Sequence, residues 1–113
     1  MHELHLAKNV VAILTEQARV HHYGRVRRVE LQLGDLGHVD AEAFAFGFDV
    51  ATRGTLAEGA VLRIERLPGE ARCIVCGTTS AIRTRADPCP ACGAHGLVVT
   101  GGDGMTIGNV EVE

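Results

Sequence analysis

All four cysteines of the chain lie in two short pairs, and each pair has the spacing of a metal-binding turn. Residues 73–77 read CIVCG and residues 89–93 read CPACG. A Cys-x-x-Cys turn lets two thiolates bind one ion, and the glycine after it supplies the left-handed backbone that such a turn often needs. Two turns facing each other make a tetrahedral four-thiolate site, which structural zinc prefers. The spacing therefore predicts a structural zinc site at Cys73, Cys76, Cys89 and Cys92.

Two other interpretations of the cysteines compete with zinc. A disulfide would suit a secreted protein, but residues 1–5, which read MHELH, contain no apolar signal segment. A redox-active Cys-x-x-Cys normally occurs once, at the start of a helix after a strand, whereas two copies stand here in a loop-rich region. The spacing favours zinc over both alternatives. It says little about function, because zinc ribbons occur in many unrelated proteins.

Length and composition limit the class of protein. A chain of 113 residues is the size of one domain. A zinc region of about thirty residues is too short to form its own core and depends on its metal. The rest of the chain must form a separate core, and aromatic residues are only 4% of the sequence. We therefore expect that core to consist of leucine, valine and isoleucine together with Phe44, Phe46 and Phe48.

Charge and hydropathy exclude further classes. The net charge is −3, which argues against a general nucleic-acid binder. The sequence has no apolar run long enough to span a bilayer. Without a signal segment, and with cysteines that read as reduced metal ligands, the expected location is the cytoplasm.

The first half of the chain alternates between helical and extended patterns. Residues 4–22 are amphipathic and predict a helix, with residues 1–3 as a short exposed leader. Residues 27–34 alternate as a strand that leaves out Val26, which is out of phase. Residues 34–39 read as a loop, and Asp40 is a good N-cap for a helix that ends by Gly54.

The second half completes an α+β pattern. Strands are predicted at 60–67, 97–100 and 105–112, the last with a bulge near Gly108-Asn109. The last strand is placed beside the earlier ones. The predicted fold is therefore two helices on a roughly three-stranded sheet, with an inserted zinc-ribbon-like domain. The expected domains are 1–69 with 98–113, which form the α+β domain, and 70–97, which form the zinc domain.

His2 stands apart from the other histidines because of its position. It can chelate a metal through its imidazole, its own backbone nitrogen and the terminal amine of Met1. Nitrogen-rich tetragonal sites suit Ni(II) and Cu(II) far better than zinc. From its position alone, a functional metal site at His2 is the less favoured interpretation. His95 lies near the cysteines, but four thiolates already complete a zinc shell.

These features together resemble a known family. They are the start Met1-His2-Glu3-Leu4, the helix behind it, the segment LGDLGHVDAE at 33–42, and the two Cys-x-x-Cys-Gly turns in this order. The sequence resembles the hydrogenase-maturation nickel metallochaperones HypA and HybF over essentially its whole length. The resemblance implies delivery of Ni(II) to the large subunit of [NiFe]-hydrogenase together with a nickel-handling GTPase. In some organisms it also implies a contribution to urease maturation.

The resemblance also implies site residues. His2 matches the family's nickel residue, Glu3 and the neighbouring backbone belong to the same site, and Asp40 matches a secondary nickel residue. The zinc ligands fall on the four cysteines named above. One departure is His5, where the family often has a small polar residue such as serine, and this leaves the helix without its usual cap and adds a candidate ligand.

We therefore interpret the chain as a nickel carrier that is not an enzyme, with no nucleic-acid or membrane partner. One alternative is a zinc-ribbon adaptor that binds protein or nucleic acid and ignores nickel. Another is a metallohydrolase, which would need an open zinc site with a bound water. A four-cysteine shell disfavours the hydrolase.

Overall fold

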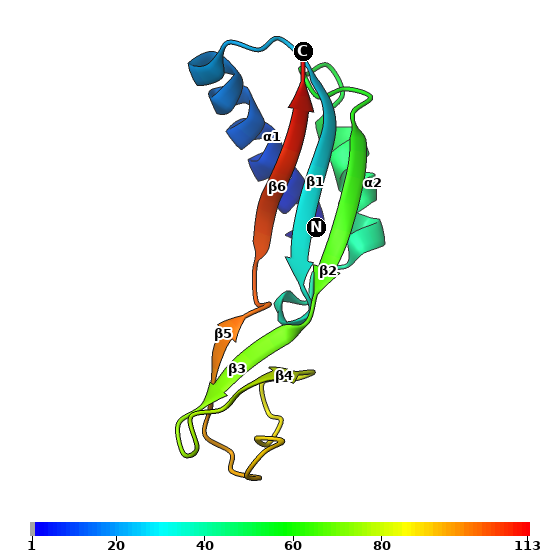
Figure 1. Ribbon diagram of the computed structural model, residues 1–113. Coiled ribbons are helices and arrows are strands. Elements are labelled where there is room, and N and C mark those ends of the chain that lie inside the picture. The colour runs from blue at the N-terminus through cyan, green and yellow to red at the C-terminus, as the bar shows by residue number, and fades with distance from the viewer. Residues whose placement is uncertain (1) are drawn as a thin grey trace. The chain divides into compact units, whose positions relative to one another are not determined.

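The computed structural model describes residues 2–113, which contain two α-helices, a short 3-10 helix and six strands (Figure 1). In chain order these are α1 (His2–His21), β1 (Val26–Gly34), η1 (Asp35–Gly37), α2 (Ala41–Ala51), β2 (Val61–Leu67), β3 (Gly69–Cys73), β4 (Thr79–Ile82), β5 (Leu97–Gly101) and β6 (Met105–Val112). The strands form two sheets of three, ordered β2-β1-β6 and β4-β3-β5. The predicted α+β class is confirmed, and the last strand lies beside β1 as expected.

The chain divides into two compact units. The described part of the first unit comprises residues 2–31, Val39–Glu65 and Ile107–Glu113, and the second unit comprises Gln32–His38 and Arg66–Thr106. These bounds differ from the expected domains, 1–69 with 98–113 and 70–97. Independent folding of either part is a separate property, so the domain assignment stays a prediction.

The core of the first unit lies between the two helices and the sheet β2-β1-β6, and Figure 1 shows both helices on one face of that sheet. α1 buries one face through Ala7, Val10, Val11 and Leu14, as its periodicity predicted. On α2 the rings of Phe44 and Phe48 stack with centroids 6.2 Å apart. Both rings are buried because residues four apart share one face of a helix.

Two expectations about this core are wrong. Phe46 does not belong to it, because this residue is 73% exposed. A residue two positions after Phe44 points to the opposite side of the helix. Val26 belongs to β1 although it is out of phase with the later strand residues. It is fully buried and its amide donates to the Leu56 carbonyl at 2.9 Å, so a backbone partner outside the strand fixes its position.

The second unit has a small hydrophobic core, so the expectation that the zinc region takes part in no core apart from its metal is wrong. β3 pairs antiparallel with both β4 and β5, and an irregularity in the β3–β5 register falls between Glu70 and Ala71. The buried residues under this sheet are Leu36, Ala71 and Ile82, with Leu97 and Val99 packed against them. The loop predicted at 34–39 is therefore partly wrong. It contains η1, whose Leu36 is 2% exposed and contributes to this core.

No helix within residues 2–113 has the length and hydropathy needed to cross a lipid bilayer.

Candidate metal centre

The first cysteine turn follows directly from the end of β3. The Gly77 amide donates to the Cys73 carbonyl at 2.9 Å, and Gly77 has φ of +76°. A side chain with a Cβ is strained at such a φ, which explains the glycine. The amides of Val75 and Cys76 point at the Cys73 sulfur, at 3.4 and 3.5 Å. The turn thus places two sulfurs on one side and directs backbone dipoles at one of them.

The second turn repeats this geometry. The Gly93 amide donates to the Cys89 carbonyl at 2.8 Å, and Gly93 has φ of +77°. The Cys89 amide donates in turn to the Ala94 carbonyl at 2.8 Å. Both turns therefore close in the same way, as their identical spacing predicted.

The two turns bring all four sulfurs together, within 4.8 Å of one another. The Cys73–Cys92 and Cys76–Cys89 sulfur pairs are each 3.7 Å apart. A zinc ion with Zn–S bonds of about 2.3 Å requires tetrahedral edges of about 3.8 Å, so the cluster fits zinc closely. A disulfide needs sulfurs about 2.05 Å apart, and the four cysteines are free.

Ionisation of the thiols is uneven. Hydrogen bonds from the Thr78 hydroxyl and then its amide lower the pKa of Cys76 to about 6. For Cys92 the Ala94 amide lowers the pKa, but the partial loss of hydration beside the sulfur cluster and the three neighbouring thiols outweigh it and raise the pKa to about 11. A metal binds thiolates, so Cys92 must release a proton when an ion enters. The sequence patterns did not identify the Thr78 hydroxyl. Its one signal in the sequence is a polar residue two positions after Cys76.

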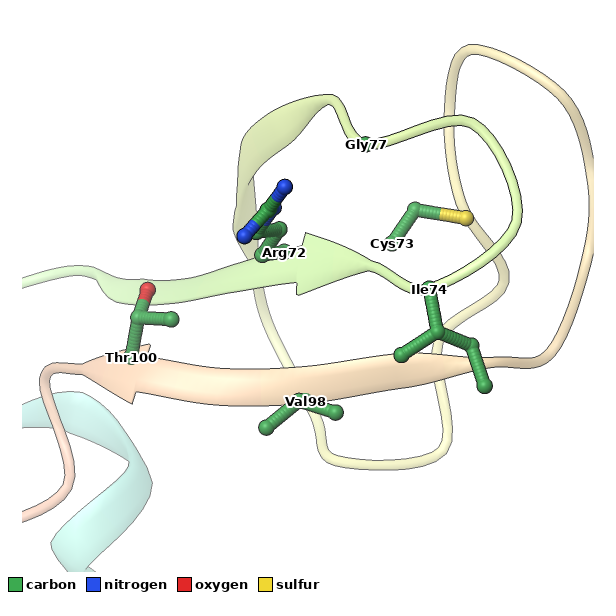
Figure 2. A pocket seen from close by; sticks show the side chains of 6 residues that line it. All are labelled: Arg72, Cys73, Ile74, Gly77, Val98 and Thr100. Atoms are coloured by element: carbon green, nitrogen blue, oxygen red, sulfur yellow. The ribbon is translucent and has the colours of Figure 1, made fainter.

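An open pocket of 470 Å³ lies beside the first turn (Figure 2). Arg72 and Val98, which line it, are direct partners across β3 and β5. Ile74 at the tip of the turn is 73% exposed, and Val98 is 54% exposed. Within residues 2–113 Arg72 makes no ion pair. Sequence reasoning did not find this surface, because the register of β3 against β5 is needed to see it.

The expected nickel residues His2 and Glu3 lie in the first turn of α1. The His2 side chain is 66% exposed, that of Glu3 is 21% exposed, and His2 Nδ1 lies 3.8 Å from Glu3 Oε2. The prediction that these two residues lie before the helix as an exposed leader is partly wrong: α1 already begins at His2, although the His2 side chain is exposed. The third leader residue, Met1, lies outside the described residues.

Asp40 caps α2, as predicted. Its Oδ1 accepts from the Glu42 amide at 2.9 Å and from the Ala43 amide at 3.1 Å. Its Oδ2 has no hydrogen-bond partner within residues 2–113. One carboxylate oxygen thus serves the helix while the other remains available to a ligand.

The structure does not draw the expected nickel residues into a formed cluster. Within the described chain, the cysteines are the one group of three or more histidine, cysteine or acidic side chains close enough to share an ion. Joint nickel binding by His2, Glu3 and Asp40 therefore stays a prediction. A contribution of His5, whose side chain is exposed on α1, also stays a prediction.

The cap at Asp40 leads to a stability prediction. Asp40→Ala removes both hydrogen bonds to the first turn of α2 and should lower the free energy of unfolding by about 1 kcal/mol. Asp40→Asn keeps an oxygen in the same place and should change it by no more than a few tenths of that, since Asn caps as well as Asp. Urea unfolding of the three proteins measures both values, and equal stability of the alanine variant and the parent would contradict the cap.

Comparison with known proteins identifies relatives over the full length of the chain. A family model described as hydrogenase/urease nickel incorporation, metallochaperone, hypA matches residues 1–112. The hydrogenase maturation factors HypA of Alkalilimnicola ehrlichii and Azotobacter vinelandii are 47% and 46% identical over 113 residues, which is 100% of this chain and of each relative. The solution structure of the Ni metallochaperone HypA from Helicobacter pylori has the same fold. It matches with a TM-score of 0.75 at 20% identity and covers 97% of this chain and 96% of that one.

Proposed function

Because the chain belongs to the HypA family of hydrogenase and urease nickel-incorporation metallochaperones, we propose that it captures Ni(II) at the start of α1 and delivers it during maturation of a [NiFe]-hydrogenase. The family match over residues 1–112 carries this proposal. The histidine at position two, exposed on the first turn of a helix, supports the place of capture.

The local electrostatics explain which donors nickel would need there. The N-terminal end of a helix carries a partial positive charge, which disfavours a bare cation. The Glu3 carboxylate, 3.8 Å from the His2 imidazole, offsets that charge. A deprotonated backbone nitrogen at His2 would offset it further and complete the nitrogen-rich set that Ni(II) prefers. The exposure of His2 suits a carrier, since a cargo ion must leave as well as bind.

Asp40 is proposed as a secondary nickel residue through its unoccupied Oδ2. The variant that tests this is Asp40→Asn, because it keeps the cap of α2 and removes the carboxylate charge. Nickel affinity of this variant therefore reports on the ligand role without a loss of helix stability.

Zinc is proposed to have a separate and structural role. Cys73, Cys76, Cys89 and Cys92 would hold the ion, which would tie the two turns together. Four thiolates complete a tetrahedral shell and leave no position for a bound water. We therefore propose that the protein is not a metallohydrolase, and the family role as a metallochaperone supports the proposal that it is not another kind of enzyme.

The proposed partners follow from the family role in hydrogenase maturation. They are a nickel-handling GTPase, the hydrogenase large subunit and, where urease is present, urease maturation proteins. The proposed setting is the cytoplasm, without a nucleic-acid or membrane partner.

Blocking the start of the chain should weaken nickel binding. If the terminal amine or the His2 backbone nitrogen is a donor, residues fused before Met1 remove the amine and crowd the backbone, while a C-terminal tag leaves both free. Calorimetric titration with Ni(II) should give a clearly lower affinity for the N-terminal fusion and an unchanged affinity for the C-terminal one. Equal affinities would remove the terminus from the site. A parent protein that binds no nickel would favour the adaptor alternative.

A further inference from the structure

Gly47 lies in the interior of the short helix α2, where a glycine calls for a structural explanation. In a helix interior glycine is about 1 kcal/mol less favourable than alanine. Gly47 lies in the middle of α2 and is buried, although Phe46 just before it is exposed. Its position in a regular helix requires no unusual backbone angle. The explanation must therefore lie in what the helix contacts at this point.

The contact is the backbone of the first turn of α1. A Cβ built on Gly47 would lie 3.1 Å from the Leu4 Cα, 3.4 Å from the Leu4 nitrogen and 3.5 Å from the Glu3 carbonyl oxygen. The first of these distances is shorter than ordinary van der Waals contact between carbon atoms. All three neighbours are main-chain atoms, so no side chain can rotate away. α2 thus touches the main chain that directly follows His2.

The helix that makes this contact, α2, is also the helix that Asp40 caps. Asp40 precedes Gly47 by seven residues, which is two turns, so both positions lie near one face of α2. Because the start of α1 rests on Gly47, the spacing between α1 and α2 at this point also sets the position of His2 and Glu3 relative to Asp40. The contact therefore bears directly on the proposed donors.

We propose that Gly47 is a positioning residue for nickel: the missing side chain lets the first turn of α1 settle against α2, which fixes the direction of His2 and Glu3. This inference rests on the proposed function. Gly47 itself donates nothing to the ion and acts through the main chain of Glu3 and Leu4.

An added methyl group should move the first turn of α1 and leave the protein folded. The apolar pocket around the contact has a volume of 320 Å³ and is lined by Glu3, Leu4, Ala43, Phe46, Gly47 and Val50. The first turn is also the end of its helix, so it can shift by a few tenths of an ångström without disturbing the buried residues from Ala7 onward. Alanine also suits a helix interior better than glycine.

The experiment compares Gly47→Ala with Ala45→Gly, a matched reverse change at an exposed position of the same helix. Gly47→Ala should bind Ni(II) about tenfold more weakly, the loss typical of residues that orient metal ligands. Its nickel d–d absorption should also change, because the donors meet the ion at altered angles. Ala45→Gly should melt at a lower temperature and keep the parent's nickel affinity and spectrum. Zinc content should be full in all three proteins.

Hydrogen exchange over residues 6–10, whose amides donate to the carbonyls of the first turn, reports on the contact without nickel, and it should be faster in Gly47→Ala than in the parent. Parent-like nickel affinity and spectrum in Gly47→Ala would overturn the inference. So would failure of this variant to fold, because Gly47 would then be a packing residue. Absence of nickel binding by the parent would instead refute the proposed function, while the exchange result would still show whether Gly47 positions the turn.

Discussion

Replacing Cys92 with alanine is expected to empty the zinc site and loosen the whole second unit. The Cys92 side chain is exposed, so its loss removes little packing and the effect must arise through the metal. Three thiolates without the fourth hold zinc more weakly, and the binding energy of a structural zinc is also folding energy. We expect metal content to fall from about one zinc per chain to a small fraction, together with faster proteolysis within Arg66–Thr106.

The second unit should be sensitive to this change because its own core is small. The cluster of buried residues there is Leu36, Ala71 and Ile82, and Cys73 and Cys89, also buried, are themselves zinc ligands. The first unit has a larger set of buried residues on α1, α2 and β1 and should keep its protection against hydrogen exchange. The two units thus serve as internal controls for each other.

Val75→Ala is the matched control for the zinc prediction. Val75 lies in the first cysteine turn, is 68% exposed and contributes only its amide to the Cys73 sulfur, which alanine retains. This variant should keep its zinc and its protease resistance. A Cys92→Ala protein with parent-like resistance after complete loss of zinc would show that the metal does not hold the second unit together.

The sequence predicted correctly those features that depend on contacts between residues close together in the chain. The two cysteine turns follow from spacing alone, and Gly77 and Gly93 have the positive φ that the motif requires. The Asp40 cap also follows from a carboxylate placed next to the first turn of its own helix. In each case the interacting atoms belong to residues within five positions of one another.

Long-range contacts explain what sequence reasoning missed. α1 extends to His2, and its first turn packs against Gly47, which lies more than forty positions away in the sequence. Leu36 follows β1 yet packs with Ala71 and Ile82, so its segment could not be assigned to their core from periodicity. Phe46 is a different kind of error. The helical period already places it opposite Phe44, and its exposure follows from applying that period strictly.

Replacing His2 with alanine is expected to abolish tight nickel binding and change little else. The side chain is 66% exposed and its nearest ionic neighbour is Glu3 at 3.8 Å, so its removal leaves no cavity and no buried charge without a partner. The free energy of unfolding should change by less than about 0.5 kcal/mol, as at ordinary surface positions. The zinc site uses sulfurs from other elements and should remain full. Nickel affinity should fall because the His2 imidazole is the side-chain nitrogen donor of the proposed site.

The pH dependence separates ligand loss from a general weakening. Imidazole binds metal in its neutral form, so protons compete with nickel and the parent should bind progressively less tightly on mild acidification. The His2→Ala protein should bind weakly at every pH. His21→Ala, an exposed histidine in the last turn of the same helix, is the matched control and should behave like the parent. Parent-like nickel affinity in His2→Ala would rule out the proposed site of capture. Nickel loss accompanied by zinc loss or a lowered melting temperature would also count against it, because the effect would then be structural.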